Sequence, residues 1–361
     1  MPLTSPFPFH GPLEPDQVHG RDAVIADLVS RITARRPTVL IAPRRFGKTS
    51  VLGASGAHLE ETTTVIRVDL YEIRSWEDLA VRLDRGLAEV SPPRRSRLDT
   101  VAAGFELSLG IVKASFARSD RPAGDLTVDR LLDVLVEYAR LHPTVVIFDE
   151  FSSIGRVDGA AGLLRTRFQH YYQQMGLVFA GSEPSVMRLL FTAPEQPFYA
   201  QADLVELGPL DKVALAAIVD DGFGGEAPPA LAARIHGFTD GHPQRSMQLA
   251  DAAWQCVEEG TDRDNGALVW GAAVQRCRAE TAASHETRFS TLGSTEQAVM
   301  RLAAGDGALF GREAELLALS HSSAQRARSA LLDRGQIVAA PDRIRVVDPL
   351  YADWIRDRFG R

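Results

Sequence analysis

Cysteine is scarce in this sequence, which holds only Cys256 and Cys277 among its 361 residues. Two cysteines so placed fit neither the ligand spacing of a metal site nor a disulfide framework, so they predict a reducing, cytoplasmic compartment. Long apolar runs are also missing, and none approaches the roughly 20 residues of a membrane-spanning helix. The first nine residues lack the charged and apolar regions of a secretory signal. We therefore expect no membrane association.

A strong excess of one charge is absent as well. The net charge is −7, which argues against a protein that coats nucleic acid over its whole surface but leaves a local basic face open. Hydrophobic residues make up 45% and charged residues 24%, as is usual for globular proteins. A chain of this length predicts two or three domains with a substantial core.

What the sequence does contain is a strand–loop–helix pattern typical of phosphate binding. An apolar run, Val39–Ile41, is followed by the loop Ala42–Gly47 and by a predicted helix that begins at Lys48. In this pattern the loop N–H groups and the positive end of the helix converge on one point, where a polyphosphate can sit. Lys48 would reach the β- and γ-phosphates, and the hydroxyl of Thr49 would hold a magnesium ion.

The loop departs from the consensus Gly-x-x-x-x-Gly-Lys-[Ser/Thr] at its first position, where Ala42 stands. A methyl group is a modest steric demand, and Gly47 still lets the backbone approach phosphate without a clashing side chain. The alternative is a chance Gly-Lys-Thr in an ordinary strand–helix turn. Further motifs elsewhere in the chain decide between a phosphate-binding loop and a chance match.

A second apolar run, Val145–Phe148, ends in Asp149 and Glu150. A continuous apolar run is typical of a parallel strand that is covered on both faces, and ligands bind at the carboxyl ends of such strands. In this Walker B pattern, Asp149 would hold magnesium through water and Glu150 would polarise the attacking water. The alternative is a strand that ends in two solvated acids, but the phosphate loop upstream favours the metal site.

A third apolar run, Leu177–Gly181, ends in Ser182, and a helix with Arg165 and Arg167 precedes it. In AAA+ ATPases, which this order of motifs resembles, the residue placed like Ser182 contacts the γ-phosphate or the lytic water. An arginine such as Arg165 could supply charge to a neighbouring nucleotide as an arginine finger. A basic, solvated helix face is the alternative for this helix.

A Gly-Arg step, Gly20-Arg21, precedes a helix predicted over Asp22–Ile32. It resembles the segment that cups the adenine in AAA+ ATPases, and a capped surface helix is the alternative. Residues 1–17 are rich in Pro and Phe and have no periodicity. They are predicted to form an extended arm on the surface.

Together these motifs resemble the archaeal-type ATPases of the STAND branch of AAA+ proteins, over nearly the whole chain. The likeness continues through Pro197–Tyr199, Leu207–Leu210, Gly237–Pro243 and Asp348–Trp354. It implies binding of ATP or ADP with Mg²⁺ by a set of loop and flanking residues, which are Gly20, Arg21, Pro43, Arg44, Arg45, Phe46, Gly47, Lys48, Thr49, Ser50 and Pro243.

Two features of the sequence bear on the rate of hydrolysis and on the identity of a sensor 2 arginine. Family members usually carry Gly-Arg where this chain has Ala200-Gln201, so the resemblance implies slow turnover. Arg245 follows the lid motif Gly241–Pro243 and is a candidate sensor 2 charge, although its spacing differs from that of AAA+ proteins with a clear sensor 2.

The predicted fold class is α/β, with a P-loop αβα ATPase core (residues 1–207), a helical lid (208–285) and a C-terminal winged helix (286–361). Within the core, Pro92–Arg95 is predicted to be a turn and Phe105–Leu109 a half-buried strand. The winged helix is predicted from a capping box at Ser294–Gln297, further helices at Glu313–Leu319 and Ser322–Arg334, and two strands about Pro341-Asp342.

Charge does not favour DNA binding by this last domain. Residues 286–361 hold 11 arginines, no lysine and 10 acidic residues, a net charge of +1, whereas a dedicated duplex reader usually carries a stronger basic bias. Arg326, Arg328, Arg343 and Arg345 could still make a small contact face. Protein docking and autoinhibition are the alternative uses of a winged helix.

The sequence therefore predicts a cytoplasmic, Mg²⁺-dependent ATPase that works as a nucleotide-controlled switch. Its expected partners are ATP and either another protein or a second copy of the chain, bound through the ATPase core. The alternative is a nucleotide-loaded, DNA-binding initiator or regulator with little turnover, similar to origin-recognition proteins.

Overall fold

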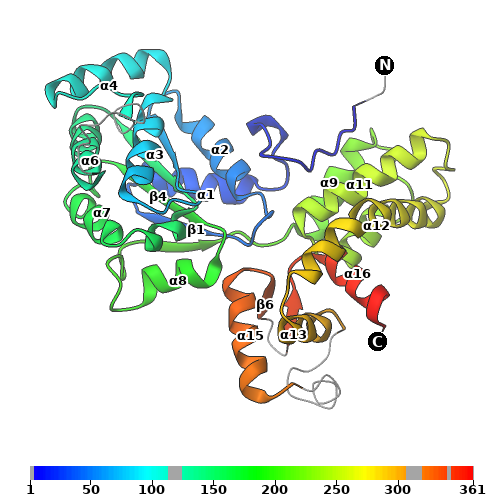
Figure 1. The fold of residues 1–361 in the computed structure, drawn as a ribbon. Helices are drawn as coiled ribbons and strands as arrows, with labels where there is room; N and C mark the ends of the chain where they lie inside the picture. Colours follow the sequence, from blue (N-terminus) through cyan, green and yellow to red (C-terminus); the bar gives the residue numbers. More distant parts are fainter. Residues whose placement is uncertain (1–3, 113–123, 306–318, 340–342, 361) are drawn as a thin grey trace. The chain divides into compact units, whose positions relative to one another are not determined.

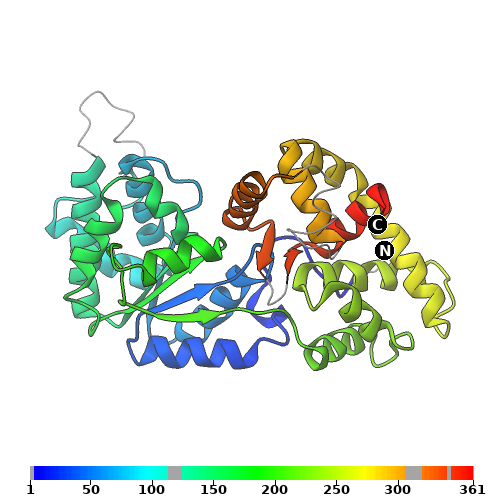
Figure 2. The ribbon, with the colours of Figure 1, turned by 90° about the horizontal axis from the view of Figure 1, so that it is seen from below.

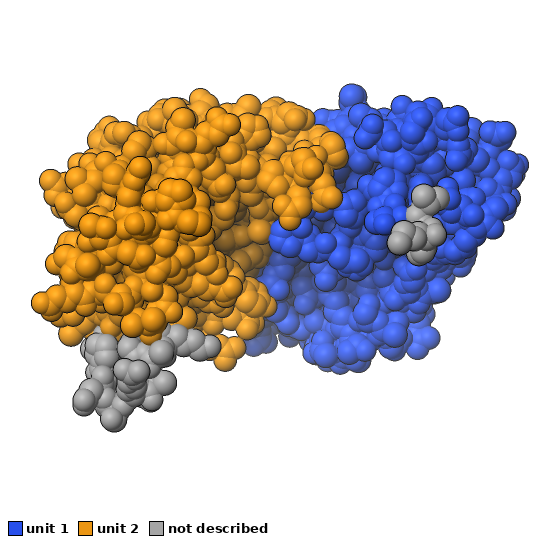
Figure 3. All heavy atoms as spheres, turned by 90° about the horizontal axis from the view of Figure 1, so that it is seen from above, with its two compact units in different colours: residues 1–13, 43–47, 208–361 blue, residues 14–42, 48–207 orange. Residues whose placement is uncertain are grey.

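A computed structural model describes residues 4–112, 124–305, 319–339 and 343–360. The chain forms two compact units, which Figure 3 distinguishes by colour. Unit 2 comprises residues 14–42 and 48–207. Unit 1 comprises residues 1–13, 43–47 and 208–361, and therefore includes most of the amino-terminal arm and the tip of the phosphate loop.

Unit 2 is built on a five-stranded parallel sheet in the order β2-β3-β4-β1-β5. Its strands are β1 (Thr38–Ile41), β2 (Thr64–Asp69), β3 (Thr144–Asp149), β4 (Gly176–Gly181) and β5 (Asp203–Glu206). The central strands β1 and β4 are buried along their whole length, which explains their continuous apolar runs. The strands β1, β3 and β4 follow the three apolar runs described above, whereas the sequence predicts no strand at β5.

Helices cover this sheet (Figures 1 and 2), and α1 packs against β1 and β4 while α3 packs against β2 and α6. They are α1 (Asp22–Thr33), α2 (Lys48–Leu59), α3 (Trp76–Ala88), α4 (Pro92–Gly104), α6 (Gly124–Leu141), α7 (Ala160–Phe168) and α8 (Pro184–Thr192), with the 3₁₀ turns η1 (Pro15–Gln17) and η2 (Phe151–Arg156). Buried phenylalanines join β3 and β4 to the neighbouring helices. Phe148 and Phe179 stack with ring centroids 5.7 Å apart.

Two local predictions for this unit are wrong. Pro92–Arg95 is not a turn but the start of α4, since proline at the first helical positions gives up no helical hydrogen bond. Phe105–Leu109 is not a strand, because Glu106 adopts a left-handed conformation (φ 57°) that ends the extended pattern. The chain that follows is instead tied to α3, where the buried carboxylate of Asp84 accepts hydrogen bonds from the N–H groups of Gly110 and Val112.

Unit 1 contains a helical cluster, in which α11 and α12 lie side by side (Figure 1). Its helices are α9 (Lys212–Gly222), α10 (Leu231–Thr239), α11 (Pro243–Glu258) and α12 (Gly266–Ser290). Phe7 of the amino-terminal arm is 1% exposed and packs against Phe223 in this cluster. The prediction that the whole arm lies on the surface is therefore wrong, because one of its aromatic rings completes a core.

The carboxyl-terminal part of unit 1 has a core of its own around Tyr351 and Ile355. Its elements are α13 (Ser294–Ala304), α15 (His321–Asp333), the antiparallel strands β6 (Ile337–Ala339) and β7 (Ile344–Val346), and α16 (Pro349–Phe359). The predicted helix over Glu313–Leu319 and the turn at Pro341-Asp342 lie outside the described residues, except for Leu319. Helix α12 runs without a break across residues 285 and 286, where the sequence predicts the boundary of the winged helix.

No helix among the described residues combines the length and the hydropathy that crossing a bilayer requires.

Candidate functional site

The loop Pro43–Gly47 has a backbone shape suited to an anion. Arg45 and Gly47 both lie in the left-handed region, with φ of 70° and 84°. Left-handed residues within such a turn bring successive N–H groups to one side, which forms a concave anion site. Helix α2 begins at the next residue, Lys48, and its first N–H groups have no helical acceptor.

Ala42, the departure from the consensus, fits this structure without strain. Its backbone is not in the left-handed region, and its N–H donates to the carbonyl of Gly181, 3.4 Å away, which extends the pairing of β1 with β4. Since the backbone needs no special conformation at this position, a methyl group is accommodated there.

Lys48 connects the loop to the two acids of the second motif. The lysine is 5% exposed, and its Nζ pairs with Oδ1 of Asp149 and lies 3.4 Å from Oε1 of Glu150. The hydroxyl of Thr49 donates to Oδ2 of Asp149 over 2.9 Å. These contacts join the first turn of α2, which follows β1, to the end of β3, although β4 separates β1 from β3 in the sheet.

Ser182, which follows β4, also joins this cluster. Its hydroxyl donates a hydrogen bond of 2.7 Å to Oε2 of Glu150, and its N–H lies 3.4 Å from the same oxygen. Glu150 itself has a left-handed backbone (φ 51°), a conformation that a non-glycine residue adopts at some cost and that is frequent at functional sites. Ser182 therefore holds the carboxylate of a strained residue.

The oxygen atoms in this cluster suit a magnesium ion. Mg²⁺ in nucleotide sites is usually held by one or two protein oxygen ligands together with substrate phosphates and water. The hydroxyl of Thr49 and the carboxylate of Asp149 lie within 2.9 Å of each other and are ligands of this kind. They therefore fit the metal that the sequence predicts.

Other predicted nucleotide-binding residues lie in the same segments of the chain. Gly20 has a left-handed backbone (φ 69°) and Arg21 is the N-cap of α1. Ser50 is buried in the first turn of α2. Pro43 and Arg44 belong to the loop itself.

Phe46 and Pro243 belong to unit 1. The ring of Phe46 meets the ring of His242 edge-on, with centroids 4.9 Å apart. His242 caps α11, where its Nδ1 accepts from the N–H of Arg245, and Pro243 is the first residue of that helix. The tip of the phosphate loop therefore contacts the start of α11.

The candidate arginine finger Arg165 lies on α7 and is half-buried. The structure assigns it no role in the Lys48 cluster. Its neighbour Arg167 is committed elsewhere, because its guanidinium donates to Asp129 (2.8 Å) and Asp133 (2.9 Å) of α6. Arg167 is therefore an inter-helix tie, which leaves Arg165 as the candidate on this helix.

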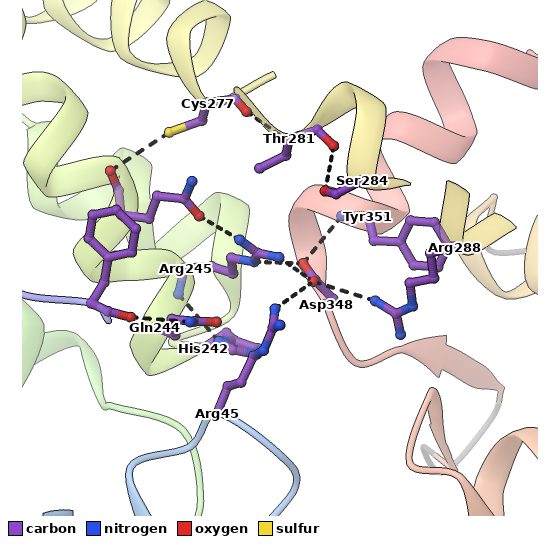
Figure 4. A network of polar contacts seen from close by, with 12 residues as sticks. Arg45, His242, Gln244, Arg245, Cys277, Thr281, Ser284, Arg288, Asp348 and Tyr351 are labelled. Atoms are coloured by element: carbon purple, nitrogen blue, oxygen red, sulfur yellow. Dashed lines mark hydrogen bonds and ion pairs between the residues drawn. The ribbon is translucent and has the colours of Figure 1, made fainter. Parts of the chain in front are cut away.

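A buried polar network around Asp348 was not predicted from the sequence (Figure 4). The carboxylate of Asp348 accepts two hydrogen bonds from Arg245, from Nε at 2.9 Å and from Nη2 at 2.5 Å. Arg245 is thus ion-paired with Asp348, so its charge is not free as that of a sensor 2 arginine would be. The Asp-Pro pair at the start of α16 is a recognisable helix N-terminus, but the sequence offers no signal for its distant arginine partner.

The contacts and burial of this network shift the pKa values of its aspartate and histidine side chains away from neutral pH. Burial alone would raise the pKa of Asp348, but the hydrogen bonds and charge of Arg245 outweigh it and lower the pKa to about 2. Burial lowers the pKa of His242 to about 4, and that of His285 to about 4. At neutral pH the aspartate is therefore ionised and both histidines are neutral.

Comparisons with known proteins place this geometry in a class of fold. No family model and no curated protein sequence matches the chain. Among solved structures, the Walker-type ATPase PABY2304 of Pyrococcus abyssi matches with a TM-score of 0.71 and 18% identity, over 97% of this chain and 99% of that chain.

Two further structures match over similar lengths. The ORC2 protein of Aeropyrum pernix, in ADPNP and ADP complexes, has a TM-score of 0.54 and 17% identity over 99% of this chain and 98% of that chain. The ORC1 protein of Aeropyrum pernix, in complex with DNA, has a TM-score of 0.50 and 14% identity over 94% and 93%. The predicted α/β fold class is confirmed: the chain has the fold of P-loop ATPases.

Proposed function

We propose that this protein is a magnesium-dependent, ATP-binding and ATP-hydrolysing regulatory switch, of the STAND branch of archaeal-type AAA+ ATPases. One observation carries the proposal. At the start of α2, Lys48 and Thr49 meet Asp149, Glu150 and Ser182 from the ends of β3 and β4, directly after a loop shaped for an anion. This is the chemistry that binding and cleaving a polyphosphate needs.

Each residue of the cluster has a distinct proposed task. The loop N–H groups and Lys48 bind the phosphates, which compensate the charge of the buried ammonium. Thr49 and Asp149 hold Mg²⁺, which when bound neutralises charge on the phosphates. Glu150 accepts the proton of the attacking water, and Ser182 keeps the Glu150 carboxylate in position.

The remaining assignments extend this site. Gly20 and Arg21 are proposed to contact the adenine, Pro243 is a further proposed nucleotide-binding residue, and Arg165 is proposed to act on the nucleotide of a second copy. The lid is taken as residues 208–285 and the winged helix as residues 286–361. The partner of the switch is proposed to be another protein or a second copy, in the cytoplasm.

The test is hydrolysis by Glu150→Gln, which keeps the size of the side chain and an oxygen that can accept from Ser182. We expect phosphate release to fall at least about 100-fold while ATP binding stays within about threefold, because only the proton acceptor is lost. Glu206→Gln is the matched control: it changes a glutamate at the end of β5 that pairs with Arg188 outside the cluster. Equal turnover by Glu150→Gln and wild type would overturn the assignment.

A second candidate function is the DNA-binding initiator with little turnover. It is supported by the likeness to the ORC1 protein that was solved with DNA. Of the described arginines in this domain, Arg334 pairs with Glu296 and Arg345 with Asp240. Arg326 is exposed on α15 and Arg328 lies two residues further along the same helix. A gel shift of labelled duplex that weakens in Arg326→Gln/Arg328→Gln would support this function. No shift at low salt would remove it.

A further inference from the structure

Three arginines surround one buried carboxylate in unit 1. Asp348 is 5% exposed, and besides the two bonds from Arg245 its Oδ2 lies 3.7 Å from Nη1 of Arg288 and 3.9 Å from Nη1 of Arg45 (Figure 4). Arg245 is also buried and donates to Gln248. A single aspartate thus faces three positive charges, so the cluster keeps a positive excess beside the phosphate loop.

The three arginines are held to very different degrees. The side chain of Arg245 is 8% exposed, that of Arg288 is 32% exposed and stands over the ring of Tyr351 at 4.3 Å, and that of Arg45 is 55% exposed. An exposed pair at 3.9 Å is weak, whereas a buried, doubly hydrogen-bonded pair is costly to break. Arg45 is therefore the partner that Asp348 can lose most easily.

Arg45 is also the arginine that an incoming phosphate would meet. It lies in the loop between two proposed phosphate-binding residues, Arg44 and Phe46, and its left-handed backbone helps to form the concave turn. A polyphosphate in that turn carries more negative charge than one carboxylate, and arginine pairs with phosphate through two parallel hydrogen bonds. Phosphate and Asp348 would compete for the same guanidinium.

We infer that Asp348 is a latch on the phosphate loop: it holds Arg45 while the loop carries no phosphate, and releases it to the phosphates of a bound nucleotide. This inference rests on the proposed nucleotide site. Arg245 keeps Asp348 ionised and in place whether or not Arg45 contacts it. The buried carboxylate therefore keeps a partner when Arg45 leaves. Because Asp348 also caps α16 by accepting from the N–H of Tyr351, its contact with Arg45 connects occupancy of the loop to the carboxyl-terminal helix.

The test is the affinity for ADP with Mg²⁺, measured by titration calorimetry, in a cycle of variants. Arg245→Gln/Asp348→Asn removes the carboxylate together with its buried partner, which avoids leaving either charge unpaired. We expect this double variant to bind ADP about two- to fivefold more tightly than wild type, the range that losing an exposed ion pair allows. Adding Arg45→Gln to the double variant should weaken ADP binding by the full loss of the Arg45–phosphate contact. In wild type the same substitution should weaken ADP binding less, because it also removes the competing contact with Asp348.

The chain offers a matched control. Arg278 of α12 donates two bonds, of 2.8 and 3.0 Å, to Asp353 of α16, which is 7% exposed. Arg278→Gln/Asp353→Asn removes the same pair of charges between neighbouring helices without touching Arg45. Its ADP affinity should equal that of wild type.

A second measurement leaves the buried pair intact. Arg45→Gln should speed hydrogen exchange of the backbone amides of residues 44–47 in the ligand-free protein, and should have little effect in the ADP complex. Unchanged exchange in the ligand-free protein overturns the latch, and so does an equal effect of Arg45→Gln on ADP affinity in both backgrounds of the cycle.

If wild type binds ADP but the double variant binds it no more tightly, the latch alone fails. If wild type binds no ADP, the proposed function fails with it.

Discussion

The hydroxyl of Ser182 lies 2.7 Å from Oε2 of Glu150 and donates a hydrogen bond to it. The bond joins the ends of β4 and β3, which are neighbours in the sheet. Ser182 thus contacts the candidate general base itself, in addition to lying where a γ-phosphate sensor was predicted. The position of the serine is what ties the orientation of Glu150 to the sheet.

Ser182→Ala should therefore lower kcat for ATP hydrolysis by about 10- to 100-fold, because a hydrogen bond to a charged group contributes roughly 1.5–3 kcal/mol. KM should change little, since the lost bond is to Glu150. Steady-state phosphate release checks this, with Ser182→Thr as the control that keeps the hydroxyl. Wild-type turnover by Ser182→Ala would show that Glu150 does not need this partner.

Ala42→Gly should leave the affinity for ADP within about twofold of wild type. Ala42 is fully buried, continues the strand pairing and needs no left-handed backbone, so the methyl group does not obstruct the loop. The substitution should instead lower stability by roughly 0.5–1 kcal/mol, the usual cost of glycine in a strand. Titration calorimetry and chemical unfolding measure the two effects. ADP binding that became tenfold tighter would mean that the alanine does obstruct phosphate.

Arg245→Gln should lower the free energy of unfolding by roughly 3–5 kcal/mol, because it leaves the buried carboxylate of Asp348 without its main partner. Adding Asp348→Asn should recover most of that loss, since neither charge is then buried alone. Unfolding in guanidinium chloride followed by circular dichroism compares the two variants. A double variant as unstable as the single one would contradict the pairing.

Stability should fall as the pH is lowered from about 6.5 to 4. The folded protein keeps His242 neutral with a pKa of about 4, whereas the unfolded chain takes up a proton near pH 6.5. The stabilisation, roughly 3 kcal/mol, is thus present above pH 6.5 and is lost as the pH falls toward 4. Thermal midpoints across this range should drop less steeply in His242→Gln than in wild type. Equal slopes would show that His242 is not the titrating group.

The sequence predicts the sheet well because its signals are local. Continuous apolar runs identify the buried strands β1, β3 and β4, and parallel strands place the polar residues after them at one edge. Strand β5 escapes this reasoning, since Asp-Leu-Val-Glu is short and only half apolar, and it becomes a strand by pairing with β1.

The parts that sequence reasoning missed depend on contacts between distant residues. In the sequence, Phe7 has no local pattern that distinguishes it from the rest of a solvated arm. In the fold it packs against α9 and its neighbours, so closely that a Cβ at Gly222 would collide with the Phe7 ring. The pairing of Arg245 with Asp348 joins residues far apart in the chain, and neither has a local pattern that identifies the other. Local periodicity carries no information about such pairs.

The measurement that tests the central claim most directly is a thermal unfolding scan with and without Mg-ATP, on wild type and on Lys48→Ala. At about 100 times its dissociation constant, ATP should stabilise the wild-type native state by roughly 2.7 kcal/mol. That corresponds to a rise of several degrees in the midpoint. Lys48→Ala should show no such rise relative to its own ligand-free midpoint. A wild type whose midpoint does not move, and which releases no nucleotide on denaturation, would contradict the claim that this loop binds nucleotide.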